Sequence, residues 1–171
     1  MDRNWVCCVV LLTASAAASA AAAGELRKAG PSEGAAVITY IVSQHNPQLT
    51  MAEKTVLSQD FNGAPLDGKP KLHTVTARSV SCRASPAPAG HTPPRCSISF
   101  GQPRPVRFGG DDAERLFSAL GKAGAAETAN ADRVQRRLRD LNCTVDDAKA
   151  QGTPSSGDDV AGFSCTFRTA P

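Results

Sequence analysis

The chain has 171 residues, of which 41% are apolar and 20% are charged, and its net charge at pH 7 is +3. This length suits one domain with a hydrophobic core that does not depend wholly on cross-links. The charge is too small to predict nucleic-acid binding, and the basic cluster of Arg133, Arg136, Arg137 and Arg139 has no interleaved aromatic residues for base stacking.

The chain begins with the features of an export signal. Arg3 precedes an apolar stretch over residues 5–18, and small residues follow, so that a signal peptidase would cut after Ala20 or Ala23. The stretch is shorter than the roughly 20 apolar residues that a membrane anchor needs. We expect residues 1–23 to be a cleaved signal peptide. The chain would then contact a membrane only if this signal were left uncleaved.

The next part of the chain predicts three features. Residues 24–36 are polar and rich in turn formers, which predicts a flexible lead-in. The β-branched run at residues 37–42 predicts a buried strand. Thr50 and Glu53 have the spacing of a capping box, which predicts a short helix over residues 51–57.

Alternation of apolar and polar residues begins after a connector rich in glycine and proline. Residues 75–82 and 96–100 predict a hairpin of two strands, and residues 106–108 predict a third strand. Asp111 and Glu114 then predict a capped helix, the best defined in the chain. The apolar stripe of this helix consists of Leu116, Phe117 and Leu120.

The end of the chain predicts a second hairpin. Residues 133–141 suit a helix or a strand, and we favour a strand over residues 139–145, followed by a last strand over residues 162–167. The predicted fold is a single secreted α+β domain over residues 37–171. In it, an antiparallel sheet of about four to six strands packs against one well-defined helix.

Four cysteines follow the export signal, one on each arm of the two predicted hairpins: Cys82, Cys96, Cys143 and Cys165. Four cysteines allow three connectivities. We predict Cys82–Cys96 and Cys143–Cys165, because neighbouring hairpin arms bring Cβ atoms within the ~4 Å that a disulfide needs. The alternative is a zinc site, but the close Cys-x-x-Cys pairs typical of zinc are missing, and export favours oxidation.

No group of residues predicts a reaction. The histidines form no His-Glu-x-x-His motif, and no serine lies in a Gly-x-Ser-x-Gly elbow. The paired aspartates at 111–112, 146–147 and 158–159 are typical of helix caps and turns, which we favour over calcium ligands or an acid–base pair. We therefore predict no catalytic residue, no metal site and no cofactor.

The loop between Cys82 and Cys96 is the most distinctive segment. Its prolines favour an extended chain and the disulfide would hold its ends, so the loop would lose little entropy on binding. This suits a recognition loop, and the alternative is a long connection whose prolines discourage edge pairing. The candidate recognition residues are Pro86, Pro88, His91, Thr92, Pro93, Pro94 and Arg95.

The same loop resembles part of the Streptomyces subtilisin inhibitor family. In that family a Gly-Thr-His-Pro segment precedes the second cysteine of the first disulfide loop, and a helix follows. Here the order is Gly90-His91-Thr92-Pro93, and residues 144–147 replace the tyrosine-containing reactive segment of the family. The resemblance covers a minor part of the chain and implies no reactive-site residue.

We interpret the chain as a small secreted or periplasmic binding or inhibitor-like module without enzymatic activity. Its ligand is not identified by the sequence, and its expected partner is an extracytoplasmic protein. The alternatives are an envelope-associated structural protein and, third, a small secreted hydrolase. The sequence leaves the oligomeric state open.

Overall fold

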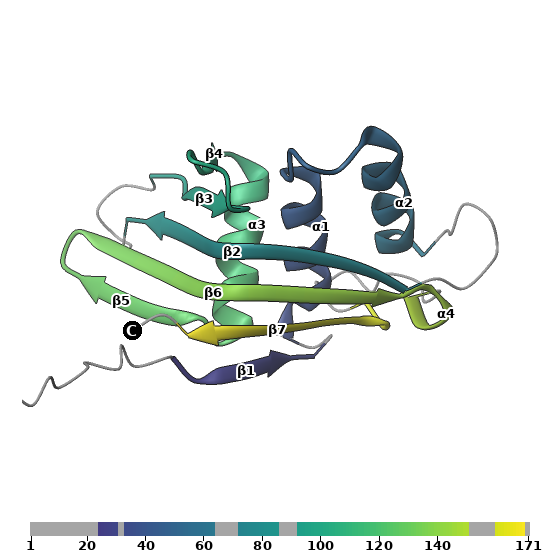
Figure 1. Cartoon of the computed structure of the whole chain (residues 1–171). Coiled ribbons are helices and arrows are strands. Elements are labelled where there is room, and N and C mark those ends of the chain that lie inside the picture. Colours follow the sequence, from purple (N-terminus) through teal and green to yellow (C-terminus); the bar gives the residue numbers. More distant parts are fainter. Residues whose placement is uncertain (1–23, 31–32, 64–71, 86–91, 151–159, 170–171) are drawn as a thin grey trace, which may run out of the picture.

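The computed structural model describes residues 24–30, 33–63, 72–85, 92–150 and 160–169. It consists of an antiparallel sheet with helices packed on one face (Figure 1). The strands are β1 (Leu26–Ala29), β2 (Leu72–Ala84), β3 (Arg95–Ser99), β4 (Val106–Phe108), β5 (Ala126–Asn130), β6 (Arg133–Asp146) and β7 (Phe163–Thr169). The helices are α1 (Ala35–Gln44), α2 (Met51–Phe61), α3 (Asp111–Lys122) and the single turn α4 (Asp147–Ala150). The predicted α+β class agrees with this architecture, but the sheet has seven strands and there are three longer helices instead of one.

The strand order is β1-β7-β6-β2-β3-β4. Strands β5 and β7 both pair with the same edge of β6, β5 along its first part and β7 along its second part. The long strands β2 and β6 form the centre, from the pair Leu72–Asp146 to the pair Ala84–Val134. Their alternation is interrupted between these ends, where Asp140 has a left-handed φ of 49°. This irregularity explains the imperfect alternation of the sequence in β2.

The strand predicted at residues 37–42 is instead part of helix α1. The segment lies in the middle of the helical layer, in contact with α2, α3, β2 and β7, so nearly all of its side chains are buried. A continuous apolar run is compatible with a buried helix as well as a buried strand, and the predicted strand is wrong. Gly34 permits the close approach to α3, because it has a φ of 85° and a Cβ there would lie 3.0 Å from the Cα of Ala119.

Two further strands were not predicted. Within the predicted lead-in, β1 pairs with β7 from Leu26–Arg168 to Ala29–Cys165, and only Ala29 of this strand is buried. Strand β5 is short and largely exposed, and it forms a hairpin with β6. Neither strand carries enough buried apolar residues to produce a periodic signal.

The helix predicted after the third strand is confirmed as α3, although its N-cap is Gly110 and not Asp111. Gly110 has a φ of 73° and supplies no side-chain cap, and Asp111, Asp112 and Glu114 occupy the first turn. Carboxylates there interact favourably with the positive end of the helix dipole. The buried residues of α3 pack onto β2, β3 and α1, and they are Ala113, Leu116, Ala119 and Leu120.

The predicted capping box is confirmed at the start of α2. The backbone N–H of Glu53 donates to Thr50 Oγ1 at 3.3 Å, and the backbone N–H of Thr50 donates to Glu53 Oε2 at 2.7 Å. The helix continues to Phe61, beyond the predicted end at residue 57. Hydrogen bonds from the Thr50 backbone and side chain lower the pKa of Glu53.

We expect Thr50→Ala to lower the free energy of unfolding by about 1 kcal/mol at neutral pH, because the cap of α2 is lost. Part of this loss depends on ionised Glu53. Since its pKa is lower in the folded state, this part is fully present above the unfolded pKa of Glu53 and disappears as the pH falls through the folded pKa. Urea denaturation at neutral pH and at a pH below the folded pKa measures both effects.

Thr55→Ala is the matched control, because the Thr55 hydroxyl donates only to the Met51 carbonyl one turn earlier on the same helix. This variant is expected to be neutral or slightly stabilising, since alanine is the better helix former. An equal loss in both variants would contradict the capping role of Thr50.

Both predicted disulfides are confirmed. Cys82–Cys96 joins β2 to β3 and Cys143–Cys165 joins β6 to β7, and each pair consists of direct cross-strand neighbours. All four cysteines are buried on the face covered by helices. Such bridges suggest an oxidising compartment outside the cytoplasm. The predicted signal peptide lies outside the described residues, and none of the described helices is both long and apolar enough to cross a membrane.

Candidate anion-binding site

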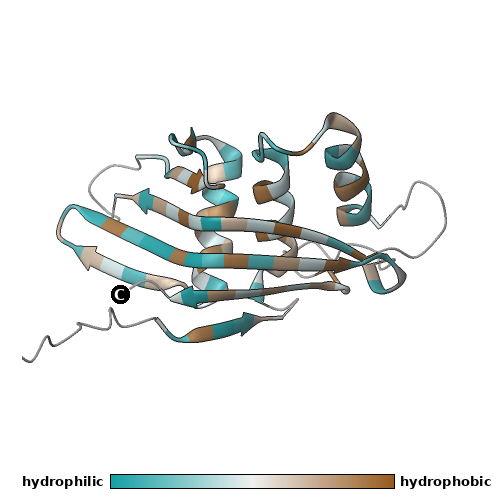
Figure 2. Ribbon diagram, viewed as in Figure 1, coloured by the Kyte–Doolittle hydropathy of each residue, from teal (hydrophilic) through white to brown (hydrophobic). Residues whose placement is uncertain are grey.

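The face of the sheet opposite the helices is polar. Apolar and polar residues alternate along the central strands, as Figure 2 shows, and the apolar ones face the helices. The opposite positions of β2, β3, β4 and β6 are occupied mainly by arginine and serine. They include Ser79, Ser81, Arg83, Arg95, Ser97, Arg107, Arg137 and Arg139.

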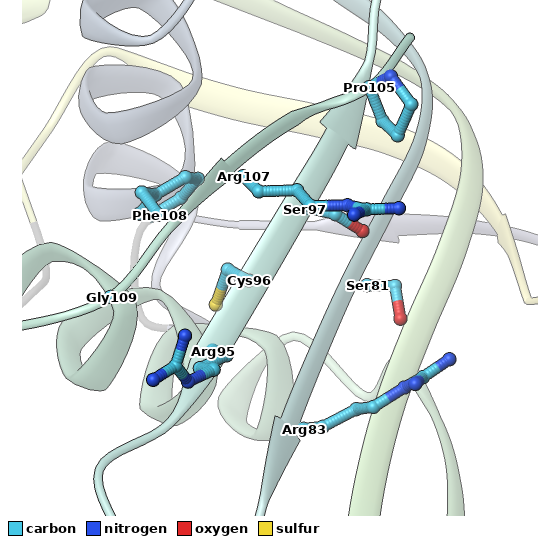
Figure 3. Close-up of a pocket in the computed structure, with 9 residues that line it drawn as sticks. All are labelled: Ser81, Arg83, Arg95, Cys96, Ser97, Pro105, Arg107, Phe108 and Gly109. Carbon is cyan, nitrogen blue, oxygen red and sulfur yellow. The ribbon is translucent and has the colours of Figure 1, made fainter.

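Strand register places these side chains in rows across the sheet. Arg107, Ser97, Ser81 and Arg137 are successive cross-strand neighbours on β4, β3, β2 and β6. In the next row, Arg83 of β2 lies directly opposite Arg95 of β3. Figure 3 shows Arg107 extending from β4 over β3 towards Ser97.

A hollow of about 480 Å³ lies over this end of the sheet (Figure 3). We call its polar part the arginine face, defined by Ser81, Arg83, Arg95, Ser97 and Arg107. The rest of its lining is Cys96, Pro105, Phe108 and Gly109. The described residues that line this hollow include no carboxylate, and the charged ones among them are all arginines.

The three arginines of the arginine face are exposed, and none has an ion-pair partner among the described residues. Arg136, on the covered face, differs: its Nε donates to Glu127 Oε2 at 2.7 Å and its Nη1 donates to the Phe117 carbonyl. Arg83 and Arg95 are like charges at directly opposite positions of the sheet, an unfavourable pairing. In Figure 3 their side chains extend in different directions, Arg83 away from β3 and Arg95 towards Gly109.

A second hollow of about 290 Å³ adjoins the arginine face and shares Arg83 and Arg95 with it. Its other lining residues are Ala84, Ser85, Thr92, Pro93, Asp132 and Arg133. The described ends of the disulfide-tethered loop therefore border the arginine face.

The structure places the predicted recognition residues in three situations. Arg95 belongs to the arginine face, and Thr92 and Pro93 line the neighbouring hollow. Pro94 is buried. The other predicted residues, Pro86, Pro88 and His91, lie outside the described residues.

Four residues of the arginine face were not predicted from the sequence: Ser81, Arg83, Ser97 and Arg107. Their only signal was the repetition of serine and arginine at outward positions of neighbouring strands, which is ordinary on an exposed sheet face. The chain matches no known protein family, and it has no significant match among curated proteins or solved structures. The chemistry of the arginine face is therefore the basis on which a function can be inferred.

Proposed function

We propose that this protein is a non-enzymatic binding module of an extracytoplasmic compartment, and that its arginine face binds an acidic segment of a partner protein. The observation that carries the proposal is the concentration of three exposed arginines and two serine hydroxyls in one hollow, with no carboxylate among its described lining residues. The two disulfides support the proposed compartment.

The chemistry of the side chains favours a carboxylate ligand. Each guanidinium presents paired N–H donors that match the two oxygens of a carboxylate, and the serine hydroxyls can donate further hydrogen bonds. Neighbouring strands lie about 4.8 Å apart, and alternate side chains of an extended peptide are separated by about 6.5–7 Å. A peptide with several acidic residues can therefore contact arginines on β2, β3 and β4 together.

The edge of the sheet favours a protein partner over an acidic polysaccharide. Strand β4 is the last strand in the order, so one side of its backbone is not paired with another strand of the described chain. A segment of the peptide that continues past the arginine face to this edge can run along β4 and form backbone hydrogen bonds there. A polysaccharide could use the arginines but not this backbone edge.

The test is the binding of fluorescent poly-L-glutamate to single variants Arg83→Gln, Arg95→Gln and Arg107→Gln, measured by anisotropy. Each variant is expected to raise Kd about two- to fivefold, because an ion pair of an exposed arginine contributes about 0.2–1 kcal/mol. The matched control is Lys54→Gln, which removes one positive charge from α2 on the opposite side of the sheet. It should leave Kd nearly unchanged.

Two results would contradict the proposal. If Lys54→Gln weakened poly-L-glutamate binding as much as the arginine variants do, the peptide would be attracted only by the net charge of the protein. If heparin bound more tightly than poly-L-glutamate at the same salt concentration, the ligand would be a sulfated polysaccharide and not an acidic protein segment. Because salt screens exposed charges, all titrations need the same ionic strength.

A further inference from the structure

Three side chains that can bind metal meet at one end of the sheet, away from the arginine face. Asp60 comes from the last turn of α2, His73 from the start of β2, and Asp147 from the start of α4. These elements lie together at the same end of the molecule in Figure 1. One donor atom from each residue lies within 4.8 Å of the other two.

Burial makes this cluster different from an ordinary surface group of charges. The side chains of Asp60 and Asp147 are 1% and 3% exposed, and that of His73 is 24% exposed. Asp147 Oδ1 is buried and has no hydrogen-bond partner among the described residues. A buried carboxylate oxygen without a partner is costly, so a ligand at this oxygen would be stabilising.

The distances in the cluster leave one of the two carboxylates outside hydrogen-bond range of the histidine. His73 Nε2 lies 3.2 Å from Asp147 Oδ2, which is a hydrogen bond, and 3.5 Å from Asp60 Oδ2, which is longer than the usual range of about 2.7–3.2 Å. One ring nitrogen also has only one proton to donate. Donors at about 2.1 Å from a metal are separated by about 3.0 Å in an octahedron and about 3.4 Å in a tetrahedron.

We propose that Asp60, His73 and Asp147 form a binding site for a divalent transition-metal cation, with Zn²⁺ as its representative. Imidazole nitrogen favours zinc and similar ions over calcium and magnesium, and carboxylate oxygens complete the set. The partly exposed His73 side chain leaves a path for the ion. Bound there, the cation joins α2, β2 and α4.

The test is calorimetric titration of ZnCl₂ into the untagged, full-length, oxidised protein. Cys7→Ser and Cys8→Ser are introduced first, because these thiols would otherwise compete for zinc. We expect one zinc ion per chain and a higher melting temperature with zinc. Asp147→Asn and His73→Gln should each raise Kd more than about tenfold and remove the zinc-dependent shift in melting temperature.

Asp112→Asn is the matched control, because Asp112 Oδ2 lies 2.9 Å from His45 Nε2 in another histidine–aspartate pair. This variant should keep the parent Kd within about twofold, since a pair offers fewer donors than the three that zinc sites usually use. Lack of saturable binding by the parent protein would overturn the proposal. An unchanged Kd in both Asp147→Asn and His73→Gln, or an equal loss in Asp112→Asn, would also overturn it.

Discussion

Replacing Cys143 and Cys165 together by alanine is expected to lower the free energy of unfolding by about 3 kcal/mol. The two residues are 22 positions apart in the chain, and a cross-link over this distance restricts the unfolded state by about that amount in the chain-entropy model. Both cysteines are also buried, so the variant loses packing at Thr39, whose Oγ1 lies 3.6 Å from Cys165 Sγ. Urea denaturation of the oxidised parent and the double variant measures the change.

The other bridge provides the comparison. Cys82 and Cys96 are 14 positions apart, so their replacement by alanine should cost about as much or slightly less. A thiol assay of the unfolded parent protein should find only Cys7 and Cys8 free if the signal is still present. A change below about 0.5 kcal/mol in either double variant would contradict the role of that bridge in stability.

Leu138→Ala is also expected to have a large effect, lowering the free energy of unfolding by about 2–5 kcal/mol. Leu138 lies in the middle of β6, is fully buried, and pairs with Val80 of β2 and Thr169 of β7. Its truncation leaves a cavity between the sheet and the helices, where the central strands have little freedom to close it. Chemical denaturation monitored by far-UV circular dichroism measures the loss.

Leu72→Ala is the control, because it makes the same change on the neighbouring strand where the side chain is 71% exposed. We expect a change within about 0.5 kcal/mol. Similar losses for Leu72 and Leu138 would mean that the helices do not cover the face of the sheet that carries Leu138.

The parts of the fold that the sequence predicted are those where alternation and cross-links agree. Strands β2, β3 and β7 have buried cysteines at alternating positions, so the same residues indicated the strands and the pairing of their sulfurs. Helix α1 could not be predicted in this way, because burial on all sides removes the polar positions that distinguish helical from strand periodicity. Strands β1 and β5 depend on pairing with β7 and β6, and their own residues are mostly exposed.

Both candidate sites depend on contacts between residues far apart in the chain. Arg95 was predicted as a recognition residue. Arg83 was not, because its position opposite Arg95 depends on the register of the hairpin. Asp60, His73 and Asp147 come from three elements and match no local motif, so their proximity requires the tertiary fold. From the sequence alone, Asp147 is predicted to lie in a turn and no metal site is predicted.

The most direct test of the binding proposal is a titration of the ¹⁵N-labelled protein with unlabelled poly-L-glutamate, followed by NMR. We predict saturable shifts at the backbone amides of Ser81, Arg83, Arg95, Ser97 and Arg107, and smaller shifts on α1 and α2. Shifts that are absent, or that are largest on the helical side of the sheet, would contradict the assignment of the arginine face as the binding site.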